Sequence, residues 1–478
     1  MRQEIEELQN LLNNGKYYPA RKQILSYLEI TPTDLNLWEL LANTFFQQRY
    51  YREAYEILAC LHLVQPLKNF ARLEELQKLL SSAPKQRFNF IEFLSLPETT
   101  ITACLIFKNN VDVIKQWYES ISNFVDEIIA VDTGCTDNTT AFLETKDNVT
   151  LVRYEWDQHF ANARNAALPY VTSEWTVWMD SDEFLEPYVL PINPLKFVAS
   201  YYKALDTTPL LSIQLHDYVE NKLQNTYQVT RMYPNTGSYH FIGRIHEQLV
   251  EKGNSQYDSV SLLSTSISFK HIGYTQEMLE KHQKMERNIK MLQLQIVEDP
   301  INPAWSMYLG REYLNINDYQ NAISHLLLAE QKLKDYPQFN RVLDIYNYLI
   351  GGYFKNNQLD LAKEICQKAL AIDPAFPNAL YYLNHIQIQE VATLIEEAYK
   401  TNIKIKQSFD TYKGIVSPDL SILNWRADYL KATILRFNGQ LAEAQQTLET
   451  ISVLEEDYKE DKQFIMDQHN KLISLLKR

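Results

Sequence analysis

Two carboxylates at the end of an apolar run are the residues of this chain best suited to chemistry. Asp180 and Asp182 follow Trp175–Met179, whose aromatic and β-branched residues predict a buried strand. In an open α/β sheet, ligands bind outside the carboxyl ends of the strands. Two closely spaced carboxylates there suit a hard divalent cation that bridges to the phosphates of a nucleotide. The same spacing also occurs by chance in acidic turns, so other segments must support a binding role.

Two further segments place polar side chains near predicted strand ends. Asp132 follows the β-rich run Glu127–Val131 and precedes a Thr-Gly turn, where a carboxylate can accept hydrogen bonds from a base or a ribose. Arg164 follows the third predicted strand, near the start of a helix whose apolar face carries Phe160. From that place it could reach a phosphate or a strand-end carboxylate, or it could be an ordinary surface arginine.

The elements that must position these residues alternate in the middle of the chain. The first four predicted strands are separated by helical patterns, which predicts parallel strands in βαβ units. The later strands lie closer together in the sequence and predict mixed pairing. The predicted strands are Thr100–Phe107, Glu127–Val131, Val149–Tyr154, Trp175–Met179, Leu211–Leu215, Gln228–Tyr233, Phe241–Val250 and Ser266–His271.

Both ends of the chain carry a helical repeat pattern. Ala20 and Ile24 recur 34 residues later as Ala54 and Leu58, and a proline follows the second helix of each copy. A small residue, an apolar residue four positions later and a terminal proline are typical of tetratricopeptide repeats. The pattern returns at Leu309, Gly310, Tyr313, Ala322, Leu326 and Ala329, then at Leu349, Tyr353, Ala362, Ala369 and Pro374, and more loosely at Ala432, Ala444 and Leu448. Because repeats bury their faces against neighbours, we expect the N-terminal pair to pack on the middle domain.

These patterns divide the 478 residues into three predicted domains. Helical repeats are expected over 1–84, an α/β domain over 98–285, and further helical repeats over 286–478. A helix over about 70–80 is expected in the connection after the first repeats. A hydrophobic fraction of 45% and a charged fraction of 22% are typical of folded globular chains.

Composition excludes several classes of protein. A formal net charge of −14 argues against a nucleic-acid-binding protein and against docking on an anionic membrane. The acidic N-terminus does not resemble a signal peptide, and no apolar run reaches the length of a membrane span. The four cysteines show no metal-site spacing. Together these features predict a cytoplasmic protein with reduced thiols.

Several segments, taken in order, resemble the nucleotide-binding half of family-two glycosyltransferases with a GT-A fold. They are Ile-Phe-Lys-Asn at 106–109, Val-Asp-Thr-Gly-Cys-Thr-Asp-Asn-Thr at 131–139, Trp-(x)3-Phe-(x)2-Ala-Arg-Asn at 156–165 and Trp-Met-Asp-Ser-Asp-Glu at 178–183. Their continuation is Thr-Arg-Met-Tyr at 230–233, Phe-Ile-Gly-Arg-Ile-His-Glu at 241–247 and His-Ile-Gly-Tyr at 271–274. It resembles the SunS-like peptide S-glycosyltransferases, which carry tetratricopeptide repeats behind the catalytic domain.

The resemblance implies roles on the donor side of a nucleotide-sugar site. Ile106, Lys108 and Asp132 would line the uracil or ribose side of a UDP-sugar. Asp180 and Asp182 would form a DXD motif that holds Mg²⁺ or Mn²⁺ against the diphosphate, where the ion acts as a Lewis acid. The fold implied is a Rossmann-like α/β GT-A core flanked by all-α repeat arrays.

The resemblance also implies roles near the acceptor. An inverting enzyme needs a general base, and Glu247 is the first candidate, followed by its neighbour His246. A hydrogen-bonded pair on the rim of a sheet is the alternative for these two residues. His271 is a candidate ligand of the metal or the diphosphate, although a lone histidine at a strand end is often structural. Arg231 is a candidate bidentate partner of the diphosphate.

The sequence therefore predicts a metal-dependent inverting hexosyltransferase that uses a UDP-sugar and a peptide, protein or glycan acceptor. A protein partner or self-association through the repeats is also expected. One alternative is a non-catalytic tetratricopeptide scaffold with a degenerate glycosyltransferase-like domain. A nucleotidyltransferase is a third possibility, which the lack of a glycine-rich phosphate loop near the first strand disfavours.

Overall fold

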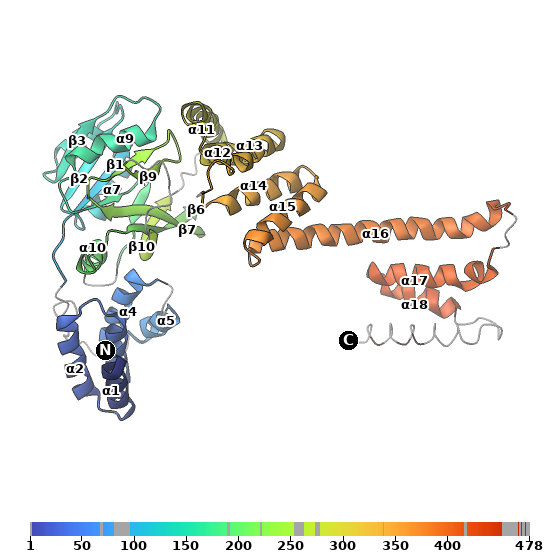
Figure 1. Ribbon diagram of the computed structural model, residues 1–478, viewed down its shortest axis with the longest axis horizontal. Coiled ribbons are helices and arrows are strands. Elements are labelled where there is room, and N and C mark those ends of the chain that lie inside the picture. Colours follow the sequence, from blue (N-terminus) through green and yellow to red (C-terminus); the bar gives the residue numbers. More distant parts are fainter. Residues whose placement is uncertain are drawn as a thin grey trace. The chain divides into compact units, whose positions relative to one another are not determined.

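The computed structural model describes most of the chain in two compact units. The described residues are 2–66, 70–80, 96–188, 192–219, 222–252, 262–272, 278–337, 339–414, 418–451, 467, 470 and 474. The first unit spans Met1–Val342 and the second Leu343–Arg478, and each is taken by itself (Figure 1). Residues 81–84 of the first predicted domain, and Gly273 and Tyr274 of the last motif, lie outside the described residues.

The first unit begins with antiparallel helices that pair as the repeat pattern predicts. They are α1 (Arg2–Asn13), α2 (Tyr17–Ile30), α3 (Leu35–Gln47), α4 (Tyr51–Val64) and α5 (Phe70–Leu79). The repeated positions Ala20, Ile24, Ala54 and Leu58 are buried where these helices meet. Small residues there let neighbouring helices approach closely. The predicted helix near 70–80 is confirmed as α5.

The N-terminal helices share a hydrophobic core with the α/β part, as expected from their short length. The Trp38 ring of α3 lies 5.8 Å from the Phe197 ring and 5.9 Å from the Tyr201 ring, both on α10 (Pro194–Ala204). Trp38 is fully buried, and its indole N–H donates to the Pro32 carbonyl over 2.9 Å. Burying a tryptophan against two further rings stabilises this junction by direct contact and by edge-to-face geometry.

Among the described residues, the α/β part is an eight-stranded sheet in the order β3-β2-β1-β4-β7-β6-β10-β5, with a separate β8-β9 hairpin. The strands are β1 (Ile101–Phe107), β2 (Glu127–Asp132), β3 (Val149–Arg153), β4 (Trp175–Trp178), β5 (Glu183–Leu185), β6 (Leu210–Val219), β7 (Lys222–Pro234), β8 (Tyr239–Ile242), β9 (Gln248–Glu251) and β10 (Leu262–Ile272). The crossover helices are α7 (Val111–Ile121), α8 (Thr139–Glu144) and α9 (Phe160–Ala167), and a short 3-10 turn, η2 (Leu168–Tyr170), follows α9.

Strand directions follow the predicted change from parallel to mixed pairing. β3, β2, β1 and β4 pair in parallel, and the first four predicted strands are confirmed to within one residue at each end. β7 is antiparallel to β4 and β6, and β10 is parallel to β6. β4, β6 and β10 therefore point the same way as β1 and β2, so their carboxyl ends lie along one edge of the sheet.

One predicted strand is wrong. The run over 241–250 is not continuous, because β8 ends at Ile242 and β9 begins at Gln248. Between them the backbone takes positive φ values at Gly243 (98°) and His246 (53°), which extended strands do not allow. A Cβ at Gly243 would lie 2.6 Å from Cη2 of Trp305, so this turn needs glycine for both its φ angle and its close approach.

Three helices complete the first unit after the sheet. They are α11 (Met278–Glu298), α12 (Pro303–Asn315) and α13 (Tyr319–Lys332). The small residue of the predicted repeat, Gly310, sits against Leu326, and a Cβ there would lie 2.5 Å from Cγ of Leu326. Ala322 and Ala329 are fully buried, as the repeat pattern predicts.

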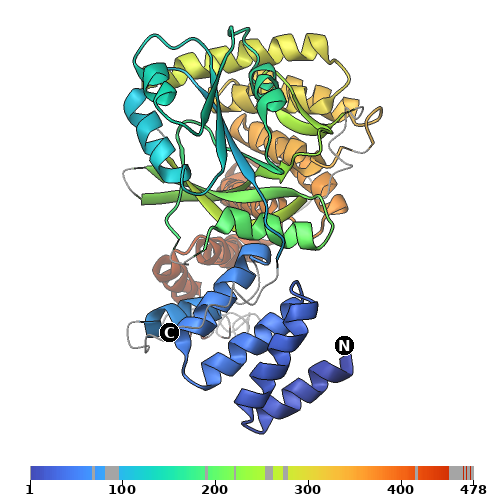
Figure 2. The same cartoon turned by 90° about the vertical axis from the view of Figure 1, so that its left-hand side faces the viewer.

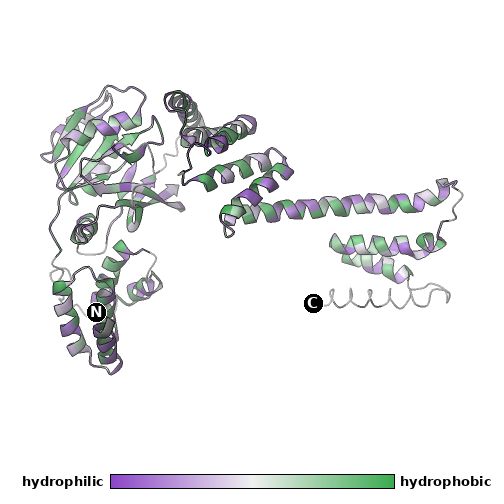
Figure 3. Ribbon diagram, viewed as in Figure 1, coloured by the Kyte–Doolittle hydropathy of each residue, from purple (hydrophilic) through white to green (hydrophobic). Residues whose placement is uncertain are grey.

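All the secondary-structure elements described in the second unit are helical. It consists of α14 (Val342–Lys355), α15 (Leu359–Ile372), α16 (Pro377–Thr411), a π-helical turn η4 (Ile422–Arg426), α17 (Ala427–Phe437) and α18 (Leu441–Ile451). Leu349, Ala362, Ala369, Ala432 and Ala444 are buried, so both C-terminal repeat matches fall on helix contacts. Apolar and polar residues alternate along α16, which at 35 residues is longer than the neighbouring helices (Figure 3).

No helix among the described residues is both long enough and apolar enough to cross a membrane.

Candidate functional site

The carboxyl edge of the sheet gathers most of the residues that the sequence singles out. Asp180 lies at the end of β4, in a network with Arg164 of α9 and Arg231 of β7. Arg164 Nη2 donates to Asp180 Oδ1 over 2.8 Å, and Arg231 Nη2 donates to Asp180 Oδ2 over 2.6 Å. Arg231 also contacts Glu183 Oε1, and Glu183 Oε2 accepts the Asp180 backbone N–H over 3.0 Å. The first aspartate of the Asp-x-Asp pair is therefore clamped by two guanidinium groups.

The partners of Asp180 are largely buried, whereas the Asp180 side chain itself is 38% exposed. Burial opposes ionisation of Asp180, but the charges of Arg231 and Arg164 hold its pKa well below the usual range. Glu183 is 2% exposed, and burial raises its pKa even though Arg231 opposes this. The charge of Asp180 also raises the pKa of Glu183, because two neighbouring carboxylates do not both ionise easily. Asp180 therefore carries the negative charge.

The second aspartate faces a different partner. Asp182 Oδ2 lies 3.4 Å from Nε2 of His271, at the end of β10. The other ring nitrogen of His271 lies 2.6 Å from Asp217 Oδ1, at the end of β6. The hydrogen bond to Asp182 raises the pKa of His271 to about 9, burial opposes that effect, and Asp217 adds to it. The imidazole ring is thus fixed between two carboxylates from neighbouring strands.

The candidate base Glu247 belongs to the turn between β8 and β9. Its Oε1 accepts a hydrogen bond from Arg164 Nε over 2.6 Å, so Arg164 joins Glu247 to Asp180. Arg164 is 4% exposed and packs its guanidinium 4.8 Å from the Trp178 ring centroid. Glu247 keeps a second carboxylate oxygen without a hydrogen-bond partner among the described residues.

His246 points to the helices that follow the sheet. Its Nε2 lies 3.1 Å from Glu312 Oε1, and its ring centroid lies 4.6 Å from that of Tyr308 on α12, with the two rings tilted by 34°. Burial and the nearby charge of Arg311 lower the pKa of His246, against the hydrogen bond to Glu312. Burial opposes ionisation of Glu312, yet His246 and Arg311 lower its pKa to about 2. His246 therefore links the β8–β9 turn to α12.

A cavity of about 470 Å³ lies next to this edge. Ile106 and Lys108, at the end of β1, line it together with Asp182. Lys284 and Arg287 of α11 line it from another side. The remaining lining residues are Phe107, Asn109, Asn110, Val113, Ile114, Thr133, Trp156, Phe160 and Ser181. Its place outside the carboxyl ends of β1 and β4 is where open α/β sheets bind ligands.

Asp132 supports the turn behind this cavity. Its Oδ1 accepts the backbone N–H groups of Gly134 over 2.9 Å and Cys135 over 2.7 Å, and Oδ2 accepts the Thr140 hydroxyl over 3.2 Å. Burial opposes ionisation, but these hydrogen bonds lower the pKa of Asp132. Asn109, which has a positive φ of 59°, accepts the Thr136 N–H over 2.7 Å and so joins the two strand ends.

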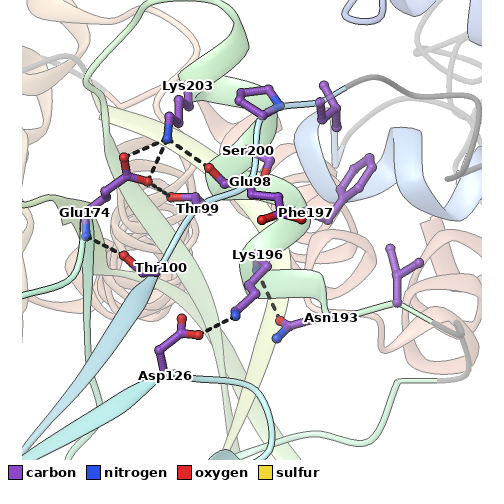
Figure 4. Close-up of a pocket in the computed structure, with 13 residues that line it drawn as sticks. Glu98, Thr99, Thr100, Asp126, Glu174, Asn193, Lys196, Phe197, Ser200 and Lys203 are labelled. Atoms are coloured by element: carbon purple, nitrogen blue, oxygen red, sulfur yellow. Dashed lines mark hydrogen bonds and ion pairs between the residues drawn. The ribbon is translucent and has the colours of Figure 1, made fainter.

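A second cavity, of about 970 Å³, lies at the opposite edge of the sheet (Figure 4). Thr100, Asp126 and Glu174 each precede a strand and mark this as the amino edge. Lys196 pairs with Asp126, and Lys203 pairs with Glu174, both over 2.6 Å. Its lysines are already neutralised, and ligands of such sheets bind at the carboxyl edge, so the smaller cavity is the candidate functional site.

Sequence reasoning missed several members of this site. Glu183 directly follows the Asp-x-Asp pair, and this position could have indicated that it belongs to the site. Asp217 lies near the end of β6, beyond the last residue of the predicted strand Leu211–Leu215, so the sequence did not place it at the edge. Glu312, Lys284 and Arg287 lie on helices assigned to the repeats or their boundary, where charged residues are ordinary surface positions.

Comparisons with known proteins agree with the expected resemblance. Residues 102–194 match the model for glycosyl transferase family 2, and residues 353–376 match a tetratricopeptide repeat model. The SPbeta prophage-derived glycosyltransferase SunS of Bacillus subtilis is 24% identical over 386 residues, which cover 79% of this chain and 86% of that protein. A tetratricopeptide repeat-containing protein of Synechococcus elongatus is 31% identical over 93 residues, 20% of this chain and 23% of that protein.

Among solved structures, that of TarS from S. aureus covers 56% of this chain and 54% of its own, with a TM-score of 0.34 and 14% identity. The predicted resemblance to a glycosyltransferase with tetratricopeptide repeats is confirmed by the sequence matches. The predicted fold, a GT-A α/β core with helical repeat arrays, is confirmed as well. Glycosyl transfer is the class of reaction that these findings support.

Proposed function

We propose that this chain is a metal-dependent, inverting hexosyltransferase that uses a UDP-sugar and a peptide, protein or glycan acceptor. The observation that carries this proposal is the shared cavity. Ile106 and Lys108, the proposed nucleoside contacts, line the same 470 Å³ space as Asp182 of the Asp-x-Asp pair. This arrangement supports a proposal in which a nucleotide base, its diphosphate and a metal bind side by side at one sheet edge.

On the donor side, the nucleoside would lie against Ile106 and Lys108. Asp132 would act at the uracil or ribose edge, and its present hydrogen bonds fix the turn that carries Thr133 into the cavity lining. Arg164 and Arg231 hold Asp180 in its ionised form. We propose that they serve the donor mainly by fixing this carboxylate.

The side chains at the edge fit a divalent cation. Asp182 Oδ2 and His271 Nε2 lie 3.4 Å apart, and both could hold one cation once His271 has lost its proton, because metal binding displaces protons from its ligands. The contact from His271 to Asp217 matches the usual carboxylate partner of a metal-binding histidine. A bound cation would neutralise charge on the leaving diphosphate as a Lewis acid. The described residues contain no group of three or more metal-binding side chains, so Asp180, water or diphosphate oxygens would complete the coordination.

On the acceptor side, Glu247 is the proposed general base. Its free oxygen can take a proton from the acceptor while Arg164 holds the other oxygen in place. His246 would hold the turn against α12 through Glu312, and it is the second candidate for the base. We place these residues in a catalytic domain over 98–285 of a cytoplasmic enzyme, with repeats over 1–84 and 286–478 available to a protein partner, the acceptor or a second copy.

The test is a screen of UDP-hexoses for hydrolysis in Mn²⁺ or Mg²⁺, followed by mass spectrometry of candidate acceptors. Chelator should abolish turnover, and added metal should restore it. Asp182→Asn should remove turnover and leave the melting temperature near that of the wild type, because Asp182 takes part in no buried ion pair with arginine. The exposed control Asp147→Asn should keep full activity.

Two outcomes would contradict this proposal. Full turnover in the presence of chelator would show that the reaction does not depend on a metal. Failure of every UDP-hexose to be hydrolysed or transferred, with metal present, would favour the non-catalytic scaffold.

A further inference from the structure

The cavity at the carboxyl edge holds more positive charge than the sequence motifs account for. Lys108, Lys284 and Arg287 line it, whereas Asp182 is its single carboxylate among the described lining residues. The chain as a whole carries 60 acidic and 46 basic residues. Cationic side chains that lie close together without carboxylate partners repel one another. Such a cluster therefore favours binding of an anion.

Two of these cations belong to one helix. Lys284 and Arg287 lie three positions apart on α11, so they are neighbours on its surface. Neither forms an ion pair with a described carboxylate. The Arg287 guanidinium lies 5.7 Å from the Phe160 ring centroid and donates a hydrogen bond to the neighbouring Asn288. Arg287 keeps part of its surface exposed, yet desolvation lowers its pKa and no carboxylate offsets the effect.

The other arginines near the site are already neutralised. Arg164 binds Asp180 and Glu247, and Arg231 binds Asp180 and Glu183. Arg231 was the predicted partner of the diphosphate, but these carboxylates already neutralise its charge. The α11 cations are therefore better placed than Arg231 to meet a diphosphate directly.

The rest of the fold holds α11 beside the cavity. Arg244, in the β8–β9 turn, forms a two-point ion pair with Glu298 over 2.6 and 2.9 Å. The Arg244 backbone N–H donates to Gln295 Oε1 over 2.7 Å. Figure 2 shows α11, in yellow, running along the edge of the α/β part. The turn that carries Glu247 thus also anchors the helix that carries Lys284 and Arg287.

We propose that Lys284 and Arg287 bind the diphosphate of the nucleotide donor, so that α11 forms one wall of the donor site. This inference rests on the proposed function, since it takes a nucleotide diphosphate as the ligand of the cavity. Lys284 and Arg287 would place positive charge beside the leaving diphosphate. This charge would add to that of the metal ion that Asp182 and His271 would hold. The donor site is then incomplete without the first helix after the sheet.

The experiment compares two charge-matched variants of the full chain. Lys284→Gln with Arg287→Gln removes both cations from the cavity. Lys290→Gln with Lys334→Gln removes two exposed lysines that do not line it. Binding of UDP, UMP and inorganic pyrophosphate is measured by calorimetry in Mg²⁺, and circular dichroism checks that each variant is folded.

Wild type should bind UDP more tightly than UMP. The cavity variant should lose at least about tenfold in affinity for UDP and pyrophosphate, since a hydrogen bond to a charged group is worth that much or more. Its affinity for UMP should fall less, and the control variant should match wild type. The salt dependence of UDP binding should also become weaker in the cavity variant.

The failure of this inference and that of the proposed function give different results. If wild type binds UDP and the folded cavity variant binds it equally well, α11 does not contact the diphosphate, and the proposed function stands. If wild type binds pyrophosphate but not UDP, the uridine assignment fails, and loss of pyrophosphate binding in the cavity variant still supports the α11 contact. If wild type binds neither, both fail.

Discussion

Asp180 and Asp182 are two residues apart, yet the structure gives them different energetic roles. Asp180 neutralises Arg164 and Arg231, and removing it would leave two largely buried guanidinium groups with less compensating charge, which is destabilising. A substitution at Asp180 would therefore mix loss of stability with loss of activity. The Asp182 side chain is paired with His271 at 3.4 Å and not with a buried arginine among the described residues, so it reports on the chemistry with less disturbance of the fold.

Glu247→Gln separates donor chemistry from acceptor chemistry. The amide oxygen can still accept the hydrogen bond from Arg164, so the variant keeps the shape of the site and loses proton acceptance. UDP-sugar binding, measured by calorimetry with Mn²⁺, should stay near wild type. Transfer to the acceptor should fall by roughly 10²–10⁴-fold, the usual contribution of general-base catalysis.

A matched control for Glu247→Gln lies on α8, away from the site. Glu144→Gln also removes a carboxylate paired with an arginine, Arg153 at 3.6 Å, but Glu144 is not part of the cavity lining. It should leave transfer largely intact. Unchanged transfer in Glu247→Gln would give the role of base to His246 or another residue, and lost UDP-sugar binding would place Glu247 in the donor site.

At the scale of elements, alanines in the repeats predict where helices touch. Ala362 of α15 is fully buried, and Ala371 of the same helix is exposed. Ala362→Leu should overpack a helix contact and lower the free energy of unfolding by about 1–3 kcal/mol. Ala371→Leu adds the same side chain on the solvent side and should change it little. Urea unfolding measures both, and equal stability of the two variants would contradict the repeat register.

Local patterns predicted most elements, and long-range contacts decided the rest. The strand-end carboxylates and buried alanines were visible because strand and helix periodicities reveal which face is buried. Partners were not visible: Arg164 and Glu247 are 83 positions apart in sequence, and His246 and Glu312 are 66. The 241–250 run was apolar enough to suggest one strand. Its turn follows from the approach of Trp305 to Gly243, which no local pattern encodes.

At the scale of the whole molecule, every residue proposed for catalysis or donor binding lies in the first compact unit. Asp132, Asp182, Glu247, His271 and Arg287 all fall within Met1–Val342. The second unit begins at Leu343 and contains helical repeats in its described residues. Donor chemistry and repeat-mediated binding should therefore be separable by truncation.

A chain that ends at Val342 should keep UDP affinity and UDP-sugar hydrolysis within about twofold of the full chain, because every residue proposed for donor binding belongs to the first unit. Transfer to a peptide or protein acceptor should fall more than hydrolysis if the repeats of the second unit recruit that acceptor. Calorimetry and a hydrolysis assay, with circular dichroism to verify folding, measure the first expectation. A folded truncated chain that fails to bind UDP, beside a full chain that binds it, would show that the second unit takes part in the donor site.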